Sequence, residues 1–234
     1  MSDPSVEPTK SSKMRFGRRL ISADSYGLVL VLILISYAVG AMWTDRKSTS
    51  LVLFIEILAV WIALRVSRAR PRLRQIAMAL MVLVAIAAVV NLFATDQQSY
   101  RVVIVTAGLL YILAPFSIIR HLAERHAVDQ ETMLGAISAY LLFGIAFAFM
   151  YLELGNIQTD FFGNGQIPTM TQTLFFSFTT LTTTGYGNLV PAGNPGQTIA
   201  VMEMILGQLF LITAMGKIVT EWRPRGWNPG AVER

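Results

Sequence analysis

Apolar stretches of membrane-spanning length dominate this sequence. A helix needs about 20 mostly apolar residues to cross a bilayer. Six stretches meet or approach that length: residues 26–43, 51–66, 75–94, 101–119, 132–153 and 198–220. The chain is 54% hydrophobic and only 14% charged, which is too apolar for an ordinary soluble domain of 234 residues. We therefore predict an all-α membrane protein with six transmembrane helices.

The positions of Lys and Arg predict the orientation of these helices. All but Arg46, Lys47 and Arg101 lie before the first span or at connections and ends that face the same side. The positive-inside rule makes that side cytoplasmic, so we expect both termini in the cytoplasm of a multi-pass cell membrane protein. The net charge of +5 is then a topology signal, with some attraction to anionic lipid headgroups. We expect membrane lipids and no nucleic acid as partners.

The chain divides into two unlike parts and three polar segments. We expect a cytoplasmic tail over residues 1–25, a four-helix bundle over 26–119, and a polar linker over 120–131 that lies on the cytoplasmic surface as an interfacial helix. Residues 132–220 form the second part, and 221–234 a short cytoplasmic tail. From the few residues after Lys217 we expect no nucleotide-binding or calcium-binding domain. This layout fits a bacterial or archaeal membrane.

The second part contains a helix that is too short to span. Residues 155–168 form a loop rich in Gly and Asn, and an amphiphilic stretch follows over 169–182. At roughly 14 residues, that stretch cannot cross a hydrocarbon core of about 30 Å, so we predict a re-entrant helix. Pro168 with the hydroxyl residues Thr169 and Thr171 favours a helix start at this point.

An irregular segment, residues 182–188, follows the re-entrant helix at membrane depth. Non-helical backbone is tolerated there only where protein buries it or where it lines a water-filled path, which indicates a pore. A stack of backbone carbonyls can replace the water shell of K⁺, and glycine supplies the unusual backbone angles that such a stack needs. We expect K⁺ as permeant ion and no other cofactor. The expected filter is Thr183, Thr184, Gly185, Tyr186 and Gly187, with K⁺ at the first four of these residues.

Two side chains and one helix end support this interpretation. Thr183 can add a hydroxyl oxygen at the inner end of the stack, and the Tyr186 ring can brace the loop from outside the ion path. The re-entrant helix directs its partially negative C-terminal end toward the cavity, which favours a cation there. Because the sequence holds one copy of the motif, four subunits are required to close a ring, so we expect three identical partner subunits.

The segment Thr180 to Asn188, preceded by Phe175-Phe176-Ser-Phe, resembles the pore loop of the tetrameric potassium channel family, whose usual form is Thr-Val-Gly-Tyr-Gly-Asp. The resemblance covers residues 132–220 as outer helix, pore helix, filter and inner helix. The earlier spans resemble only the general layout of six-helix, voltage-gated-like channels. In the inner helix, Gly207 stands where the family often has a hinge glycine.

Departures from the family motif concern the support of the filter. Thr184 replaces a usual valine, and Asn188 replaces an aspartate that the family uses to anchor the filter to the pore helix. Thr179 lies where some members carry a glutamate that meets this aspartate. With Phe175 and Phe176 we take Thr179 and Asn188 as filter support. We expect potassium selectivity but not the ordinary stability of the filter.

The fourth span lacks the pattern of a voltage sensor. A sensor needs Arg or Lys at every third position, since one charge gains about 2.3 kcal/mol per 100 mV in crossing the membrane field. Here Arg101 and Arg120 lie only at the two ends of the span. We predict passive K⁺ conduction without steep voltage dependence.

Two acidic residues lie inside predicted spans. An intramembrane carboxylate is a candidate functional group, and these candidates are Glu56 and Glu203. Glu56 is either proton-sensitive or a counter-charge, or it is hydrogen-bonded inside the bundle to a neighbour such as Asn91. Glu203, one helical turn before Gly207, either influences ions behind the filter or joins the pore helices.

Other functions fit the sequence less well. The chain has no cysteine, and the two histidines, His121 and His126, lie in the polar linker with a spacing that does not place them on one helix face. We therefore expect no enzyme, haem or zinc site. A weakly selective monovalent cation channel, suggested by Thr184 and Asn188, and a regulatory subunit of another channel remain alternatives.

Overall fold

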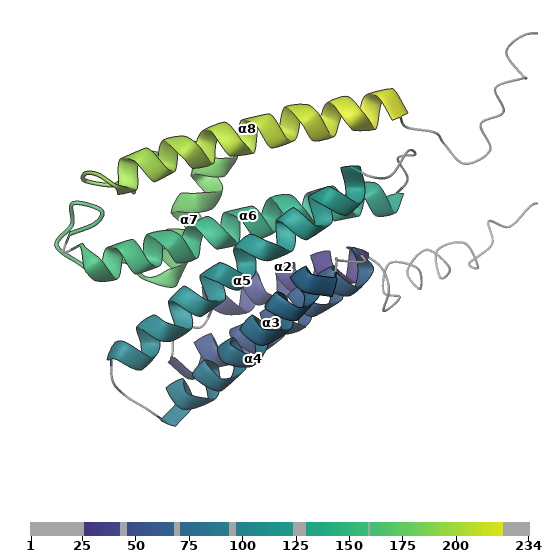
Figure 1. Ribbon diagram of the computed structural model, residues 1–234. Helices are drawn as coiled ribbons and strands as arrows, with labels where there is room; N and C mark the ends of the chain where they lie inside the picture. The colour runs from purple at the N-terminus through teal and green to yellow at the C-terminus, as the bar shows by residue number, and fades with distance from the viewer. Residues whose placement is uncertain are drawn as a thin grey trace, which may run out of the picture.

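The computed structural model describes residues 26–42, 46–67, 71–93, 97–123, 130–158 and 160–221. The described residues form helices and their connections, with no strand among them. Figure 1 shows two parts, a bundle and a group of helices packed on one side of it. This agrees with the all-α class expected from the sequence.

The first four helices form the bundle. They are α2 (Tyr26–Met42), α3 (Arg46–Val66), α4 (Pro71–Phe93) and α5 (Gln97–Ala123). Very short connections join consecutive helices, which favours antiparallel neighbours. Small and branched apolar side chains, among them Val29, Ala63 and Ile104, fill the interior of the bundle almost without exposure.

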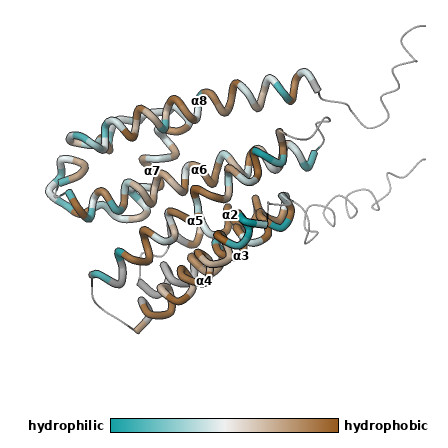
Figure 2. Tube along the Cα trace, in the orientation of Figure 1, coloured by the Kyte–Doolittle hydropathy of each residue, from teal (hydrophilic) through white to brown (hydrophobic). Residues whose placement is uncertain are grey.

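The second part consists of α6 (Gln130–Ile157), the short α7 (Met170–Leu181) and α8 (Gly196–Glu221). Pro71–Val90, Arg101–Ala123, Gln130–Ile157 and Gly196–Thr220 are long and apolar enough to cross a membrane, and Tyr26–Val39 is a shorter apolar helix. Figure 2 shows the hydrophobic residues along the long helices. The described residues therefore support four of the six expected spans by length and composition, and the count of six stays a prediction.

The bundle packs against α6 of the same chain, through α5 and α2. Tyr111 of α5 stacks on Phe149 of α6 with ring centroids 5.3 Å apart. At one end, the backbone N–H of Tyr26 donates to the Glu131 carboxylate (3.1 Å). In this structure the bundle and the second part of the same chain are therefore packed together.

The two ends of the expected linker over 120–131 belong to the neighbouring helices, and the linker itself stays a prediction. α5 continues through Ala123, and α6 already begins at Gln130, so only residues 124–129 remain, and they lie outside the described residues. The physical reason is packing, since Leu122 is buried against α6 near Gly135 and extends the apolar face of α5 by another turn.

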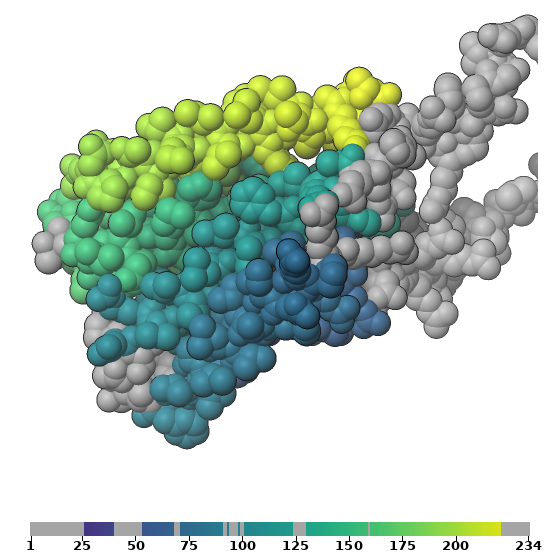
Figure 3. Space-filling view, in the orientation of Figure 1, coloured from purple at the N-terminus to yellow at the C-terminus, as the bar shows by residue number. Residues whose placement is uncertain are grey.

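Helix α8 lies along one edge of the chain and packs mainly on α6 and α7, with Lys217 reaching α5 (Figures 1 and 3). Most of its large apolar side chains are exposed, among them Val201, Met202, Ile205, Leu209, Ile212 and Met215. An isolated soluble chain rarely exposes so much contiguous apolar surface. The helix therefore presents a face that lipid or further protein would cover.

Candidate functional site

The short helix α7 is built as the sequence predicted. Thr169 is its N-cap: its hydroxyl accepts from the Gln172 N–H (3.3 Å), and the Gln172 side chain accepts from the Thr169 N–H (2.9 Å). This reciprocal capping box satisfies N–H groups that have no partner within the helix. The helix ends at Leu181, where the segment of the expected filter begins.

The backbone of this segment has positive φ angles at alternate positions: 58° at Thr183, 55° at Gly185 and 77° at Gly187. The positive angles of the two glycines were expected. The angle at Thr183 was not, because a non-glycine residue rarely adopts it and nothing in the residue type signals it. Such backbone strain concentrates at functional sites.

The C-terminal end of α7 holds the segment in place. The carbonyl of Thr179 accepts from the backbone N–H of Thr184 (2.8 Å) and of Gly185 (3.0 Å). The Thr184 hydroxyl lies 2.8 Å from the Thr182 hydroxyl. Thr179 thus supports the segment through its backbone, which its side-chain identity could not predict, and Thr184 gains a hydrogen bond that valine would lack.

The expected support residues lie in different places. The ring of Phe175 stacks on the ring of Tyr186 with centroids 5.7 Å apart. Phe176 is buried, and its ring lies edge-on to the ring of Tyr151 of α6 with centroids 4.9 Å apart, so Phe176 anchors α7 to α6. Asn188 is exposed, and its side chain forms no hydrogen bond with any described residue.

The two candidate intramembrane acids differ in their surroundings. Glu203 is fully buried and joined by hydrogen bonds to Tyr151 and Ser177, two partners that sequence reasoning missed because nothing in their spacing links them to Glu203. Glu56 is buried in the bundle, and its Oε2 has no hydrogen-bond partner among the described residues. The side chain of Asn91, its expected partner, lies outside the described residues.

Gly207 lies within the continuous helix α8, at a close contact with the end of α7. A Cβ atom at this position would stand 2.5 Å from the carbonyl oxygen of Leu181, the last residue of α7. The structure therefore offers close packing as a reason for glycine here. The hinge role stays a prediction. Among the described residues, no group of three His, Asp or Glu side chains could hold a metal ion.

A family model described as an ion channel matches residues 135–222, from the first turns of α6 to just beyond the end of α8. The inward rectifier potassium channel Kirbac3.1 of Paramagnetospirillum magnetotacticum is 35% identical over 79 residues, which are 34% of this chain and 25% of that protein. Over this part, the chain therefore resembles the potassium channel family.

Another potassium channel extends the likeness toward the bundle. A cyclic nucleotide-gated potassium channel of Rhizobium etli is 33% identical over 130 residues, which are 55% of this chain and 34% of that protein. The chain thus spans about a quarter and about a third of the length of these two potassium channels. The family and these relatives are ion channels and not enzymes. No solved structure matches the chain.

Proposed function

We propose that four copies of this chain form a potassium-selective channel whose filter is the segment Thr183 to Gly187. The observation that carries the proposal is the backbone of this segment. Positive φ angles alternate along it, and Thr179 at the end of α7 holds it by two N–H bonds. An irregular backbone fixed in this way beside membrane-spanning helices is suited to line an ion path.

Potassium is the ion that this chemistry favours. Rings of backbone carbonyls from Thr183, Thr184, Gly185 and Tyr186 would replace its water shell. The Thr183 hydroxyl would add oxygens at the inner end, and the C-terminal ends of four α7 helices would stabilise a cation below the filter. The relatives named as potassium channels support the same choice.

A tetramer follows from what a single chain leaves exposed. One chain supplies one wall of the filter, and Tyr186 is 71% exposed in it. Three further identical subunits would cover Tyr186 and part of the apolar face of α8. Membrane lipids, including anionic ones on the cytoplasmic side, would cover the outward face of α4, where Val82 and Ile86 are exposed.

The proposed channel lies in the cell membrane with both termini in the cytoplasm. The backbone N–H of Tyr26, at the start of α2, donates to the Glu131 carboxylate. Near the end of α8, the Lys217 ammonium group donates to the Leu122 carbonyl (3.0 Å). These contacts place the start of α2 and the end of α8 at the same end of the molecule. At the opposite end Arg101 pairs with Glu153 (2.7 Å). A charge tied at the helix end is not placed to move through the membrane, which supports passive conduction without steep voltage dependence.

Ion flux into liposomes tests the proposal. We expect the purified chain to carry K⁺ faster than Na⁺, and Gly185→Ala to abolish the flux because alanine resists the positive φ angle. Gly165→Ala is the matched control. Like Gly185, Gly165 has a positive φ (71°) and nothing within 4 Å of an added Cβ, but it lies in the loop before α7, so the flux of Gly165→Ala should equal that of the wild type.

The alternatives give different results in this experiment. Equal K⁺ and Na⁺ fluxes would mean that Thr184 and Asn188 loosen the filter, which makes the chain a weakly selective monovalent cation channel. No flux from the wild type, with flux restored by another channel subunit, would make it a regulatory subunit. Loss of flux in Gly165→Ala as well would assign the effect of Gly185→Ala to misfolding.

A further inference from the structure

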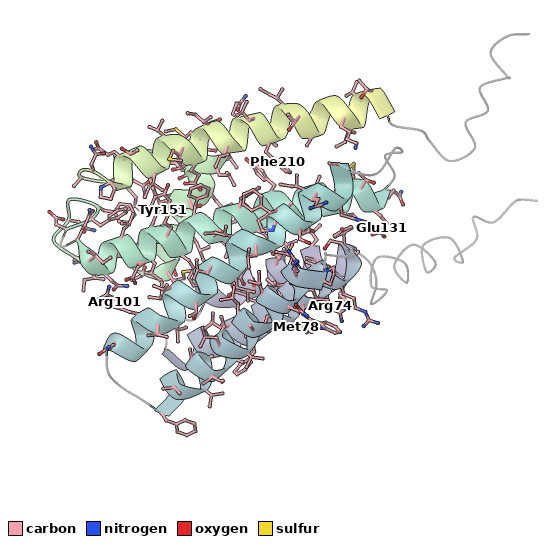
Figure 4. All side chains as sticks on the ribbon, viewed as in Figure 1. Arg74, Met78, Arg101, Glu131, Tyr151 and Phe210 are labelled. Atoms are coloured by element: carbon pink, nitrogen blue, oxygen red, sulfur yellow. The ribbon has the colours of Figure 1, made fainter. Side chains whose placement is uncertain are left out.

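The side chain of Glu203 joins all three helices of the second part. It extends from α8 and is fully buried. The hydroxyl of Tyr151 on α6 donates to its Oε2 (2.7 Å), and the hydroxyl of Ser177 on α7 lies 2.5 Å from its Oε1. Ser177 also lies 2.7 Å from the carbonyl oxygen of Gly144 on α6. Figure 4 shows Tyr151 between α6 and α8.

Counting protons in this cluster determines the direction of each hydrogen bond. A hydroxyl group has one proton, and a carbonyl oxygen can only accept. Ser177 must therefore use its proton for the Gly144 carbonyl, since nothing else in that contact can donate. The 2.5 Å contact between Ser177 and Glu203 then needs a second proton, and only the carboxyl group of Glu203 can carry it.

The surroundings of Glu203 also disfavour a carboxylate. A buried charge is costly unless a partner of opposite charge compensates it, and Glu203 has no basic partner among the described residues. The titratable groups that face it are Tyr151 and Tyr140, both on α6 and both without positive charge. The nearest described basic residue on its own helix, Lys217, lies about 21 Å along the axis and bonds to α5.

We propose that Glu203 is held as a neutral carboxylic acid that receives a hydrogen bond from Tyr151 and donates one to Ser177. Every proton of the cluster is then used once: Tyr151 to Oε2, Oε1 to Ser177, and Ser177 to Gly144. The carboxylic acid is a positioning group that fixes α7 between α6 and α8.

The consequence for conduction rests on the proposed function. Ser177 lies two residues before Thr179, whose carbonyl holds the N–H groups of Thr184 and Gly185. A displacement of Ser177 therefore moves the group that supports the filter. Positions 179 and 188 hold Thr and Asn, and not a pair of acidic residues that could support the filter. The hydrogen bond between Glu203 of α8 and Ser177 of α7 supplies such support instead.

Substitutions at position 203 test whether Glu203 acts as a neutral hydrogen-bond donor or as a charged carboxylate. Glu203→Gln keeps an acceptor for Tyr151 and a donor for Ser177, so we expect its K⁺/Na⁺ flux ratio to stay within about twofold of the wild type and its melting temperature to stay unchanged. Glu203→Ala leaves Tyr151 and Ser177 without partners and should lower the melting temperature by about 5 °C. Glu203→Asp keeps a carboxyl group that can be protonated but is too short to reach Tyr151 and Ser177, so the K⁺/Na⁺ flux ratios of Glu203→Asp and of Glu203→Ala should both fall.

Infrared spectroscopy detects the protonation of the Glu203 carboxyl group directly, and it does not depend on ion conduction. The wild type should show the C=O stretching band of a protonated carboxylic acid, and Glu203→Gln should lack this component while Glu56→Gln retains it. A flux ratio or melting temperature of Glu203→Gln as low as that of Glu203→Ala would overturn the proposal. So would an acid band unchanged in Glu203→Gln. If the wild type carries no flux, the proposed function fails, and the band and the melting temperature still decide the state of Glu203.

Discussion

Gly207 of α8 lies against the backbone carbonyl of Leu181, so close that a Cβ atom at position 207 would stand 2.5 Å from that oxygen. The same carbonyl accepts a hydrogen bond from the hydroxyl of Tyr140 on α6 (2.9 Å). The end of α7, where the proposed filter begins, is thus held from both neighbouring helices. Close packing at this point and bending at a hinge are separate reasons for a glycine, and they predict different results.

Alanine at position 207 tests the packing. The added Cβ must displace Leu181, and overpacking costs about 1–3 kcal/mol, which exceeds the gain of about 0.5–1 kcal/mol that alanine brings to a helix. We expect a lower melting temperature and a lower K⁺ flux for Gly207→Ala. Gly216→Ala, on the same helix with nothing within 4 Å, is the control and should be as stable as the wild type or more so. An unchanged melting temperature with altered opening would favour the hinge.

The stacked pair of Phe175 and Tyr186 predicts an effect on selectivity. Aromatic pairs contribute about 0.5–1.5 kcal/mol beyond the area they bury. Phe175→Leu keeps an apolar side chain but loses the stacking, so the K⁺/Na⁺ flux ratio should fall by about 2- to 10-fold. Phe175→Tyr keeps the ring and should retain the ratio. Equal ratios in both variants would show that the stacking does not support the filter.

The capping box at Thr169 predicts a loss of stability without loss of selectivity. Removal of such a cap costs about 0.5–2 kcal/mol, so Thr169→Ala should lower the melting temperature. Thr169→Ser keeps the hydroxyl and should restore it. Because the cap lies at the opposite end of α7 from Thr179, the flux ratio should not change. A changed ratio would contradict the local effect that we expect.

The ion pair of Arg101 and Glu153 predicts a small coupling and no role in voltage sensing. Arg101 is 46% exposed and Glu153 17% exposed, and pairs near the surface contribute about 0.2–1 kcal/mol. A double-mutant cycle with Arg101→Gln and Glu153→Gln, measured by thermal unfolding, should give a coupling in that range. Recordings from planar bilayers should show a shallow conductance–voltage relation that Arg101→Gln leaves unchanged. A steep relation that Arg101→Gln flattens would assign gating charge to this residue.

The sequence by itself predicted what depends on local chemistry. The apolar stretches predicted the long helices, to within a few residues at most ends. Pro168 and the threonines after it predicted the start of α7, and the glycines at 185 and 187 predicted the positive φ angles. These features follow from helix capping, hydropathy and the conformational freedom of glycine, which involve residues close together in the chain. The positive φ at Thr183 escaped prediction because threonine does not signal it.

Tertiary structure alone decided which residues meet across helices. Ser177 and Tyr151 reach Glu203 from separations of 26 and 52 residues, and no periodicity in the sequence connects them. Leu122 extends α5 through part of the expected linker because α6 offers a surface to bury it. The state of an acid in the membrane and the end of a helix both depend on the partners that packing brings near, and those partners follow from the arrangement of the helices and not from their individual sequences.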